Sequence, residues 1–376
     1  MTGTGPFDAV TDAELDDLRQ RLRRTRWPRR WPGDVELGWA AGTPDAVVRR
    51  LTDVWATTYD WRRYEREIAE LPWGRAHLHG TEVAFLLYEG RGPAPLPIVL
   101  TNGWPSSFWE LRNLAAQLSL GQAAGPAFTV VVPCLPGFPG TDQAAQFPAA
   151  VPTHELWHAL MAEHLGYRRF GAHGGDLGAG PTSLLGQEHP DEVLGIHLTS
   201  IADPLEYDSD SLTSDERGYL DEAAHWSTDE GAYEHLQMTR PQTLSYGLSD
   251  SPAGLLAWMV EKYFAWTDND GTLESVFDDD EVLTQASLYW FGQCISTSFR
   301  PYFEFARGHG LRVARVDVPT AVAVFPKDLV HPPRSWAERT YNVQRYTRMA
   351  RGGHFAALEE TQLLADDIAE FFAPLR

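Results

Sequence analysis

The alternation of apolar and polar residues changes near residue 75. After this point, short apolar runs typical of buried strands are separated by longer segments with helical periodicity. Strands that alternate with helices predict a mostly parallel sheet with crossover helices, which places the chain in the α/β class. The strand-like runs span residues 82–88, 97–100, 128–132, 170–173, 194–198 and 320–325.

A second change of pattern lies between the last two of these runs. From residue 203 to residue 310 the strand-like runs stop, and helical segments such as 253–266 take over. We expect an inserted helical cap here, so that the core comprises residues 75–202 and 311–376. The acidic run 278–281 is expected to be a solvated loop.

The first 74 residues form a third region, which holds six of the 14 tryptophans and many arginines. Thr11 and Glu14 have the spacing of a capping box, which predicts a helix that begins near Thr11 and ends at Trp27-Pro28. So many large rings cannot be buried within so short a segment. We therefore expect a lid that wraps over the following domain.

Composition and charge narrow the classes of function. Apolar residues make up 43% and aromatic residues 12% of the 376 positions, as in a folded, enzyme-sized protein. The net charge of −21 would repel nucleic acid, so we expect no nucleic-acid partner. No apolar run approaches the roughly 18 residues of a membrane span, so we expect no membrane insertion. The only two cysteines, Cys134 and Cys294, and a start without a signal-peptide pattern predict a cytoplasmic protein.

The most informative segment follows the run 170–173. There Gly174-Gly175-Asp176-Leu177-Gly178 leads from an apolar strand into a helix-compatible segment, which is the form of a nucleophile elbow. Small residues are needed two positions before and after the nucleophile, because the turn is strained and passes close to neighbouring chain. Asp176 takes the position of the serine of serine hydrolases. A turn-forming aspartate is the simpler alternative if this segment is taken alone.

Other segments fit the same interpretation. His354, in a glycine-rich loop before a terminal amphipathic helix, stands where the histidine of an α/β-hydrolase triad belongs. Asp328, after the last strand-like run, is the favoured acid, and Asp203, after the preceding run, is the second candidate. The loop 101–106 is either a source of N–H donors for an oxyanion hole or an ordinary turn.

Motifs along nearly the whole chain together resemble epoxide hydrolases of the microsomal type, in the α/β-hydrolase superfamily. The resemblance implies an α/β-hydrolase fold with a helical cap, conversion of an epoxide to a vicinal diol, and no cofactor or metal. It also makes a homodimer a reasonable expectation. The motifs are Tyr59-Asp60-Trp61-Arg62, Gly103-Trp104-Pro105, Leu135-Pro136-Gly137-Phe138, Gly174-Gly175-Asp176, Asp250-Ser251-Pro252, Leu288-Tyr289-Trp290, Pro332-Pro333-Arg334-Ser335-Trp336 and Arg351-Gly352-Gly353-His354-Phe355-Ala356-Ala357.

Carried over residue by residue, the resemblance implies that Asp176 is the nucleophile, His354 the base and Asp328 its orienting acid. Tyr233 and Tyr302 match the two cap tyrosines that hydrogen-bond the epoxide oxygen. Without the resemblance, these two tyrosines would be interpreted as packing residues.

The resemblance also assigns the oxyanion hole to the N–H groups of Trp104 and Leu177, and it implies a cis bond before Pro105. Two residues depart from the family pattern, which usually has His at the position of Asn102 and Trp at that of Leu177. Leu177 keeps its backbone N–H. We therefore expect the departures at Asn102 and Leu177 to affect which substrate shape fits the site more than they affect the mechanism.

The chemistry also follows from the residue types. A carboxylate that attacks a saturated carbon forms an ester, which water can open at its carbonyl, whereas serine would leave an ether. The departing alkoxide needs a proton, and tyrosine hydroxyls are suitable donors. Haloalkane dehalogenases share the ester but hold a halide with donors such as tryptophan indoles. Leu177 has no side-chain donor, which favours the epoxide.

Two alternatives belong to other classes. The segment His154-Glu155-Leu156-Trp157-His158 has the zinc-protease pattern, with two imidazoles on one face of a helix. Against it, the segment has the apolar pattern of a crossover helix, and His164 is not in the register of a known third ligand. The other alternative is a catalytically silent binding protein, although every proposed triad position is filled.

Overall fold

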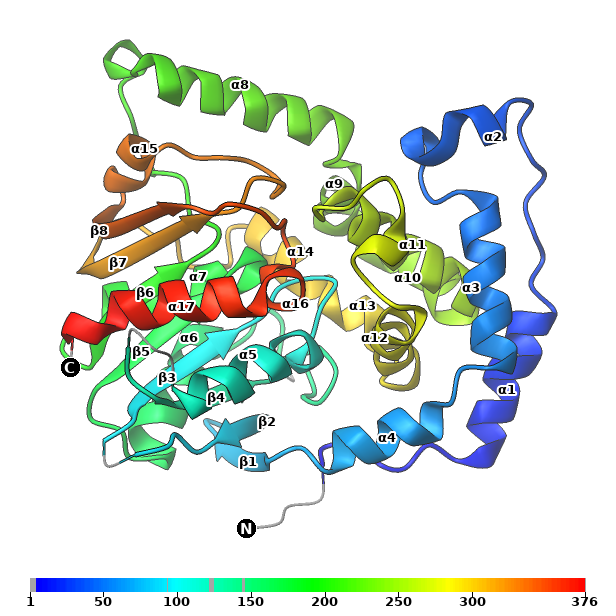
Figure 1. Cartoon of the computed structure of the whole chain (residues 1–376), viewed down its shortest axis with the longest axis horizontal. Coiled ribbons are helices and arrows are strands. Elements are labelled where there is room, and N and C mark those ends of the chain that lie inside the picture. Colours follow the sequence, from blue (N-terminus) through cyan, green and yellow to red (C-terminus); the bar gives the residue numbers. More distant parts are fainter. Residues whose placement is uncertain (1–4, 93, 122–124, 144–145, 376) are drawn as a thin grey trace.

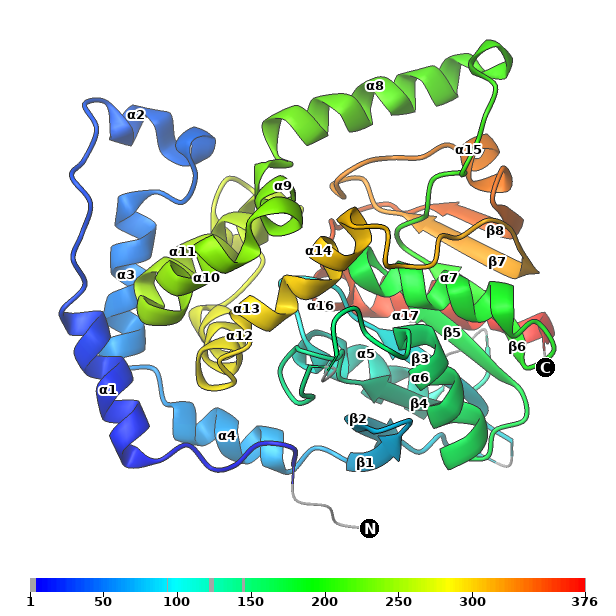
Figure 2. The same ribbon diagram turned by 180° about the vertical axis from the view of Figure 1, so that it is seen from behind.

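The computed structural model describes residues 5–92, 94–121, 125–143 and 146–375, and within them an eight-stranded sheet forms the centre of the molecule (Figure 1, Figure 2). Its strand order is β1-β2-β4-β3-β5-β6-β7-β8. β1 and β2 are antiparallel to their neighbours, and the pairs from β4 to β8 are parallel, so the predicted mostly parallel sheet is confirmed. The strands are β1 (Trp73–Leu78), β2 (Thr81–Tyr88), β3 (Leu96–Thr101), β4 (Phe128–Pro133), β5 (Phe170–Gly174), β6 (Val193–Leu198), β7 (Val316–Val324) and β8 (Tyr341–Arg348).

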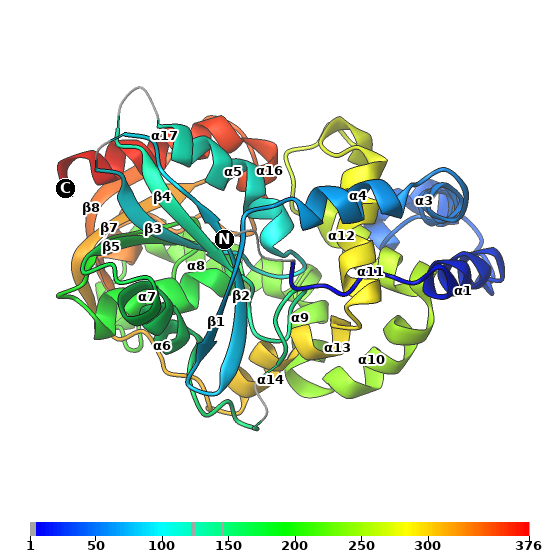
Figure 3. The same ribbon diagram turned by 90° about the horizontal axis from the view of Figure 1, so that it is seen from below.

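Helices cover both faces of the sheet (Figure 3). α5 (Phe108–Leu120) and α17 (Thr361–Phe372) lie together on one face, and α6 (Thr153–His158) and α7 (Ala179–Glu188) lie on the other. Every residue of β4 and β6 is buried, as expected for strands between two helical layers. The carboxyl ends of parallel strands meet at one edge of such a sheet, which is where ligands bind in open α/β folds.

A group of helices follows β6 in the chain; most of them lie beyond that edge of the sheet, while the first long one extends back alongside β7 and β8 (Figure 2). The segment predicted to be helical at 253–266 is α11. The group comprises α8 (Ser214–Asp229), α9 (Ala232–Thr239), α10 (Pro241–Asp250), α11 (Pro252–Ala265), α12 (Asp279–Phe291), α13 (Ile295–Ser298) and α14 (Arg300–Ala306).

The acidic run 278–281 is not the solvated loop predicted from the sequence. Asp278 is the N-cap of α12, and its carboxylate accepts a hydrogen bond of 2.7 Å from the N–H of Glu281. The remaining acids form the first helical turn, where the helix dipole favours negative charge. A run of like charges alone does not distinguish a loop from a helix start.

The helices before β1 are α1 (Asp12–Arg23), α2 (Asp34–Leu37), α3 (Asp45–Thr57) and α4 (Trp61–Ala69). The capping box predicted at Thr11 is confirmed. The predicted end at Trp27-Pro28 is wrong, because the buried apolar stripe of α1 stops at Leu22 and the helix ends at Arg23.

Of these helices, α1, α3 and α4 pack against α11 and α12 (Figure 1). The Trp55 indole Nε1 donates to Ser287 Oγ at 3.0 Å, and the hydroxyls of Tyr59 and Thr284 are 3.0 Å apart, both buried. Trp31, by contrast, is 67% exposed. The segment therefore covers the inserted helices with some of its aromatic rings.

Candidate active site

The turn after β5 holds Asp176 in a backbone conformation that side-chain-bearing residues rarely adopt. Its φ is +48°, which is the strained geometry expected of a nucleophile elbow. The flanking glycines are needed for space. A Cβ at Gly174 would overlap Gly178 O, and one at Gly178 would overlap Thr101 O. The tightly packed turn therefore fixes the position of Asp176 at the carboxyl edge of the sheet.

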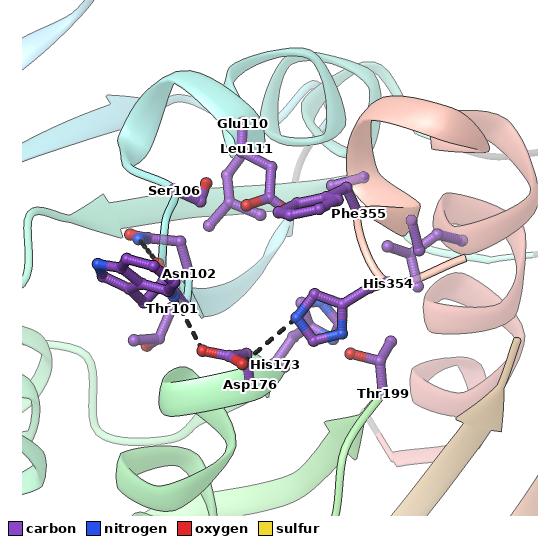
Figure 4. A pocket seen from close by; sticks show the side chains of 16 residues that line it. Thr101, Asn102, Ser106, Glu110, Leu111, His173, Asp176, Thr199, His354 and Phe355 are labelled. Carbon is purple, nitrogen blue, oxygen red and sulfur yellow. Dashed lines mark hydrogen bonds and ion pairs between the residues drawn. The ribbon is translucent and has the colours of Figure 1, made fainter. Parts of the chain in front are cut away.

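The two oxygens of the Asp176 carboxylate have different partners. Oδ1 accepts hydrogen bonds from the N–H of Trp104 at 2.9 Å and the N–H of Leu177 at 2.6 Å. Oδ2 lies 3.3 Å from Nε2 of His354 (Figure 4). One oxygen is thus held by backbone donors, and the other faces the imidazole.

The loop that donates through Trp104 is fixed by the inserted helices. Tyr263 of α11 donates to Pro105 O at 3.0 Å, and Tyr289 of α12 donates to Ser106 O at 2.8 Å. The Trp104-Pro105 peptide is cis, as the resemblance implied. Asn102, which replaces the usual histidine, donates from Nδ2 to Gly103 O at 2.9 Å and so contacts the same loop.

His354 lies between two carboxylates and is 5% exposed. Its Nδ1 is 2.6 Å from Asp328 Oδ1. Asp203, the second candidate acid, lies elsewhere and accepts from Trp336 Nε1 at 2.9 Å. The structure brings together Asp176, His354 and Asp328, and it leaves Asp203 outside this group.

The electrostatics of His354 follow from this position. Burial disfavours the charged imidazolium, but the charges of Asp328 and Asp176 outweigh it and raise the pKa of His354 well above its usual range. Because Asp176 is one of the groups that raise this pKa, removing the negative charge of Asp176 would lower the pKa of His354.

Two tyrosines approach the site from the inserted helices. Tyr233 of α9 is stacked on the Trp104 ring with centroids 5.3 Å apart, and Tyr302 of α14 meets the same ring edge-on at 6.3 Å. Burial, with the negative charge of Asp176, raises the pKa of both hydroxyls well above their usual range, so both are protonated. The buried hydroxyl of Tyr302 lies near that of Tyr233 but has no partner with full hydrogen-bond geometry in the described part of the chain.

A small cavity lies beside the carboxylate and the imidazole (Figure 4). Its volume is about 30 Å³, enough for a water molecule. Ser106, Glu110 and Thr199 contribute polar groups to its lining, and neither tyrosine lines it. Burial raises the pKa of Glu110 to about 7, against the opposing effects of Ser106 and His354.

The sequence analysis missed several residues around the site. Glu359 accepts from the N–H groups of Gly353 and Phe355, each at 3.0 Å, and so holds the chain on both sides of His354. Gln237 is fully buried one helical turn after Tyr233 on α9, and its amide has no hydrogen-bond partner among the described residues. Neither residue stands in a motif whose chemistry is evident from spacing alone.

Lys262 was also missed. It is one of two lysines in the chain and is 3% exposed. Its ammonium lies 4.5 Å from the centroid of the Tyr233 ring and 2.7 Å from Glu261 Oε2. A buried lysine is rare enough to be a signal, but only the fold shows that it faces Tyr233.

The zinc-protease pattern does not form its expected ligand set. That motif needs His154 and His158 to converge with a third ligand. In the described residues the converging group is instead Glu155, His158 and His189. Trp157, within the motif, is fully buried and donates to Thr101 Oγ1 at 3.1 Å, as expected of a crossover helix.

Comparisons with known proteins agree with this geometry. The family model described as "Epoxide hydrolase N terminus" matches residues 6–111. A putative epoxide hydrolase of Stigmatella aurantiaca is 39% identical over all of this chain and 86% of its own length. Epoxide hydrolase 1 of Sus scrofa is 30% identical over 98% of this chain and 88% of its own. The crystal structure of juvenile hormone epoxide hydrolase from Bombyx mori superposes with a TM-score of 0.88, at 26% identity, covering 100% of this chain and 95% of that one.

The geometry predicts which carboxylate controls the titration of His354. In Asp328→Asn the pKa of His354 should fall, because the neighbouring negative charge that favours the imidazolium is lost. In Asp203→Asn it should not change. Titration of the His354 ring signals by NMR measures both. A fall in Asp203→Asn, with none in Asp328→Asn, would contradict the assignment.

Proposed function

The chain belongs to the microsomal-type epoxide hydrolases of the α/β-hydrolase superfamily and hydrolyses epoxides, and we propose that it does so through an ester between the substrate and Asp176. The observation that carries this mechanism is that the two oxygens of the Asp176 carboxylate have different surroundings. Oδ1 is held by two N–H donors, and Oδ2 is left to attack. A carboxylate in a structural turn would not need an oxyanion hole.

In the first step, Asp176 Oδ2 attacks a ring carbon of the epoxide. A carbon–oxygen bond forms to the enzyme, the strained carbon–oxygen bond breaks, and its electron pair goes to the epoxide oxygen. Tyr233 or Tyr302 gives that oxygen a proton. Their protonated state in a buried pocket supports this role, as does the Tyr302 hydroxyl, which has no partner with full hydrogen-bond geometry among the described residues.

In the second step, water attacks the ester carbonyl, and His354 takes its proton. Negative charge develops on Oδ1, where the N–H groups of Trp104 and Leu177 already point. The intermediate then collapses: the bond from the carbonyl carbon to Oδ2 breaks, and Oδ2 leaves with the diol after taking the proton from His354. The proton that the new Asp176 carboxyl group releases goes to the tyrosinate left by the first step, which restores the enzyme.

The ester has no charge, so the pKa of His354 falls after the first step and the imidazole can act as base. Asp328 keeps the ring oriented. The cavity lined by Ser106 and Glu110 has room for this water.

The same features disfavour the haloalkane and binding-protein alternatives. A departing halide needs no proton, so a haloalkane dehalogenase would have no use for protonated tyrosines beside the nucleophile. Leu177 brings only its backbone N–H to Oδ1, and a halide-binding indole is absent at that position. A silent binding protein would not need Asp176 in a strained conformation against His354.

The setting of the reaction belongs to the same proposal. We propose a lid at residues 1–74, a core at 75–202 and 311–376, and a cap at 203–310 that supplies both tyrosines. The reaction needs no cofactor or metal, because every step has a protein group to perform it. We also propose a cytoplasmic location, which suits the free thiols of Cys134 and Cys294. The family resemblance further leads us to propose a homodimer that acts on a small-molecule epoxide. In the described part of the chain, none of the helices has the length and apolarity needed to cross a bilayer.

Replacing the base separates the two steps. His354→Gln should form the ester and fail to hydrolyse it, because only the second step needs a base. After incubation with an epoxide that the wild-type enzyme hydrolyses, mass spectrometry should show that the protein is heavier by the mass of one substrate molecule. The adduct should lie on the peptide that contains Asp176. Asp176→Asn is the control and should form no adduct. An adduct that persists in Asp176→Asn would contradict the assignment of the nucleophile.

Lys262 should assist proton donation by Tyr233. A buried cation beside the ring stabilises the phenolate more than the phenol, and the carboxylate of Glu261, which pairs with Lys262, offsets part of this effect. A net effect of about 1 kcal/mol corresponds to roughly fivefold in rate. Single-turnover ester formation should therefore slow about fivefold in Lys262→Met and less in Lys262→Arg. Hydrolysis of the preformed ester should not change, which also shows that the fold is intact. Ester formation at the wild-type rate in Lys262→Met would exclude this role.

A further inference from the structure

A second cluster of chemically active side chains lies at the other end of α7 from Asp176. His189 follows the last residue of α7, and Glu155 and His158 are on α6. The candidate ligand atoms of these three residues lie within 4.8 Å of one another. Ten helical residues, about 15 Å, separate this cluster from the elbow, so it takes no part in the hydrolysis.

The contacts within the cluster converge on one oxygen. Glu155 Oε1 is 3.0 Å from His189 Nε2 and 3.2 Å from His154 Nε2. The rings of His158 and His189 are stacked with centroids 3.7 Å apart. Glu192 adds a second carboxylate 4.0 Å from His158 Nε2. Three imidazoles and two carboxylates thus surround a small volume.

Two of the ring nitrogens have no hydrogen-bond partner. Nε2 of His154 and Nε2 of His158 are both buried and unpaired among the described residues. The His154 side chain is 1% exposed, and its Nε2 is not aligned for a hydrogen bond to Glu155. Buried polar atoms without partners are uncommon and call for an explanation.

We propose that Glu155, His158 and His189 bind one divalent transition-metal ion of the zinc type. Two imidazoles and one carboxylate are a common protein ligand set for Zn²⁺, with water as the fourth ligand. The metal would displace the hydrogen bond between His189 and Glu155, and the two stacked rings would splay apart to converge on it. His154 would then orient Glu155, and Glu192 would balance charge.

This arrangement differs from that of a zinc protease. In the protease motif the glutamate is the base and the two helical histidines are ligands. Here Glu155 is itself a ligand, and His189 replaces His154 in the set. The metal would join α6 to the end of α7, the helix that follows the nucleophile elbow, and would act on stability and not on turnover.

The test uses tag-free full-length protein and Co²⁺ as a spectroscopic probe, followed by Zn²⁺. Wild-type protein should bind one equivalent of Co²⁺ with the intense visible absorption of a four-coordinate site, and Zn²⁺ should displace it and raise the thermal midpoint. His158→Ala, His189→Ala and Glu155→Gln should lose both effects. His225→Ala, at an exposed histidine of α8, is the matched control and should keep them.

Epoxide turnover gives an independent check on these variants. Wild-type turnover should be the same with Zn²⁺ and with a chelator, and the cluster variants should stay active, which shows that they are folded. The proposal is overturned if wild-type protein binds no more Co²⁺ than His158→Ala and His189→Ala. It is also overturned if one equivalent still binds when both histidines are replaced together.

Discussion

A buried imidazole between two carboxylates is the interaction on which the rest of the site depends. His354 is 2.6 Å from Asp328 and 3.3 Å from Asp176. Such a charge triad is stable away from water only if each member keeps its hydrogen bonds. Asp176 does so through the backbone N–H groups of Trp104 and Leu177. In the proposed mechanism, the donors that stabilise the resting carboxylate would also stabilise the oxyanion, so one geometry would support both states.

The inserted helices and the N-terminal segment extend this constraint outward. Tyr263 and Tyr289 hold the carbonyls of the loop that carries Trp104. The helices that provide them, α11 and α12, are packed in turn against the N-terminal helices through contacts such as Trp55 to Ser287. A residue far from the chemistry can therefore influence the oxyanion hole through two layers of packing.

Much of this arrangement could be predicted from the sequence, because it depends on local patterns. The buried strands are continuous apolar runs, and the glycines of the elbow mark a close backbone approach that the structure contains. β1 and β8 were missed because they are edge strands with polar residues such as Arg75 and Gln344, which weaken the apolar signal. The alternation of polar and apolar residues in β1 and β8 was the sequence feature that could have identified them as strands.

The parts of the site that the sequence analysis did not reveal depend on contacts between distant segments. Lys262 stands in an ordinary amphipathic helix, and nothing in its neighbours indicates that it faces Tyr233. From the sequence, Asp328 is favoured over Asp203 because it follows the last strand before His354, although both aspartates follow strands and fit the chain order. In the structure, Asp328 Oδ1 lies 2.6 Å from His354 Nδ1, whereas Asp203 accepts a hydrogen bond from Trp336. The histidine-rich motif at 154–158 pairs His154 with His158, whereas the residues that converge in the structure are Glu155, His158 and His189, and His189 comes from the end of another helix.

The origin of the oxygen in the first diol tests the ester mechanism most directly. Enzyme in excess is mixed with an epoxide in water enriched in heavy oxygen, and the product of a single turnover is analysed by mass spectrometry. If water attacks the ester at the Asp176 carbonyl, the first diol carries ordinary oxygen from the carboxylate, and the label appears in Asp176. If the first diol carries the label, water has attacked the epoxide itself, and Asp176 is not the nucleophile.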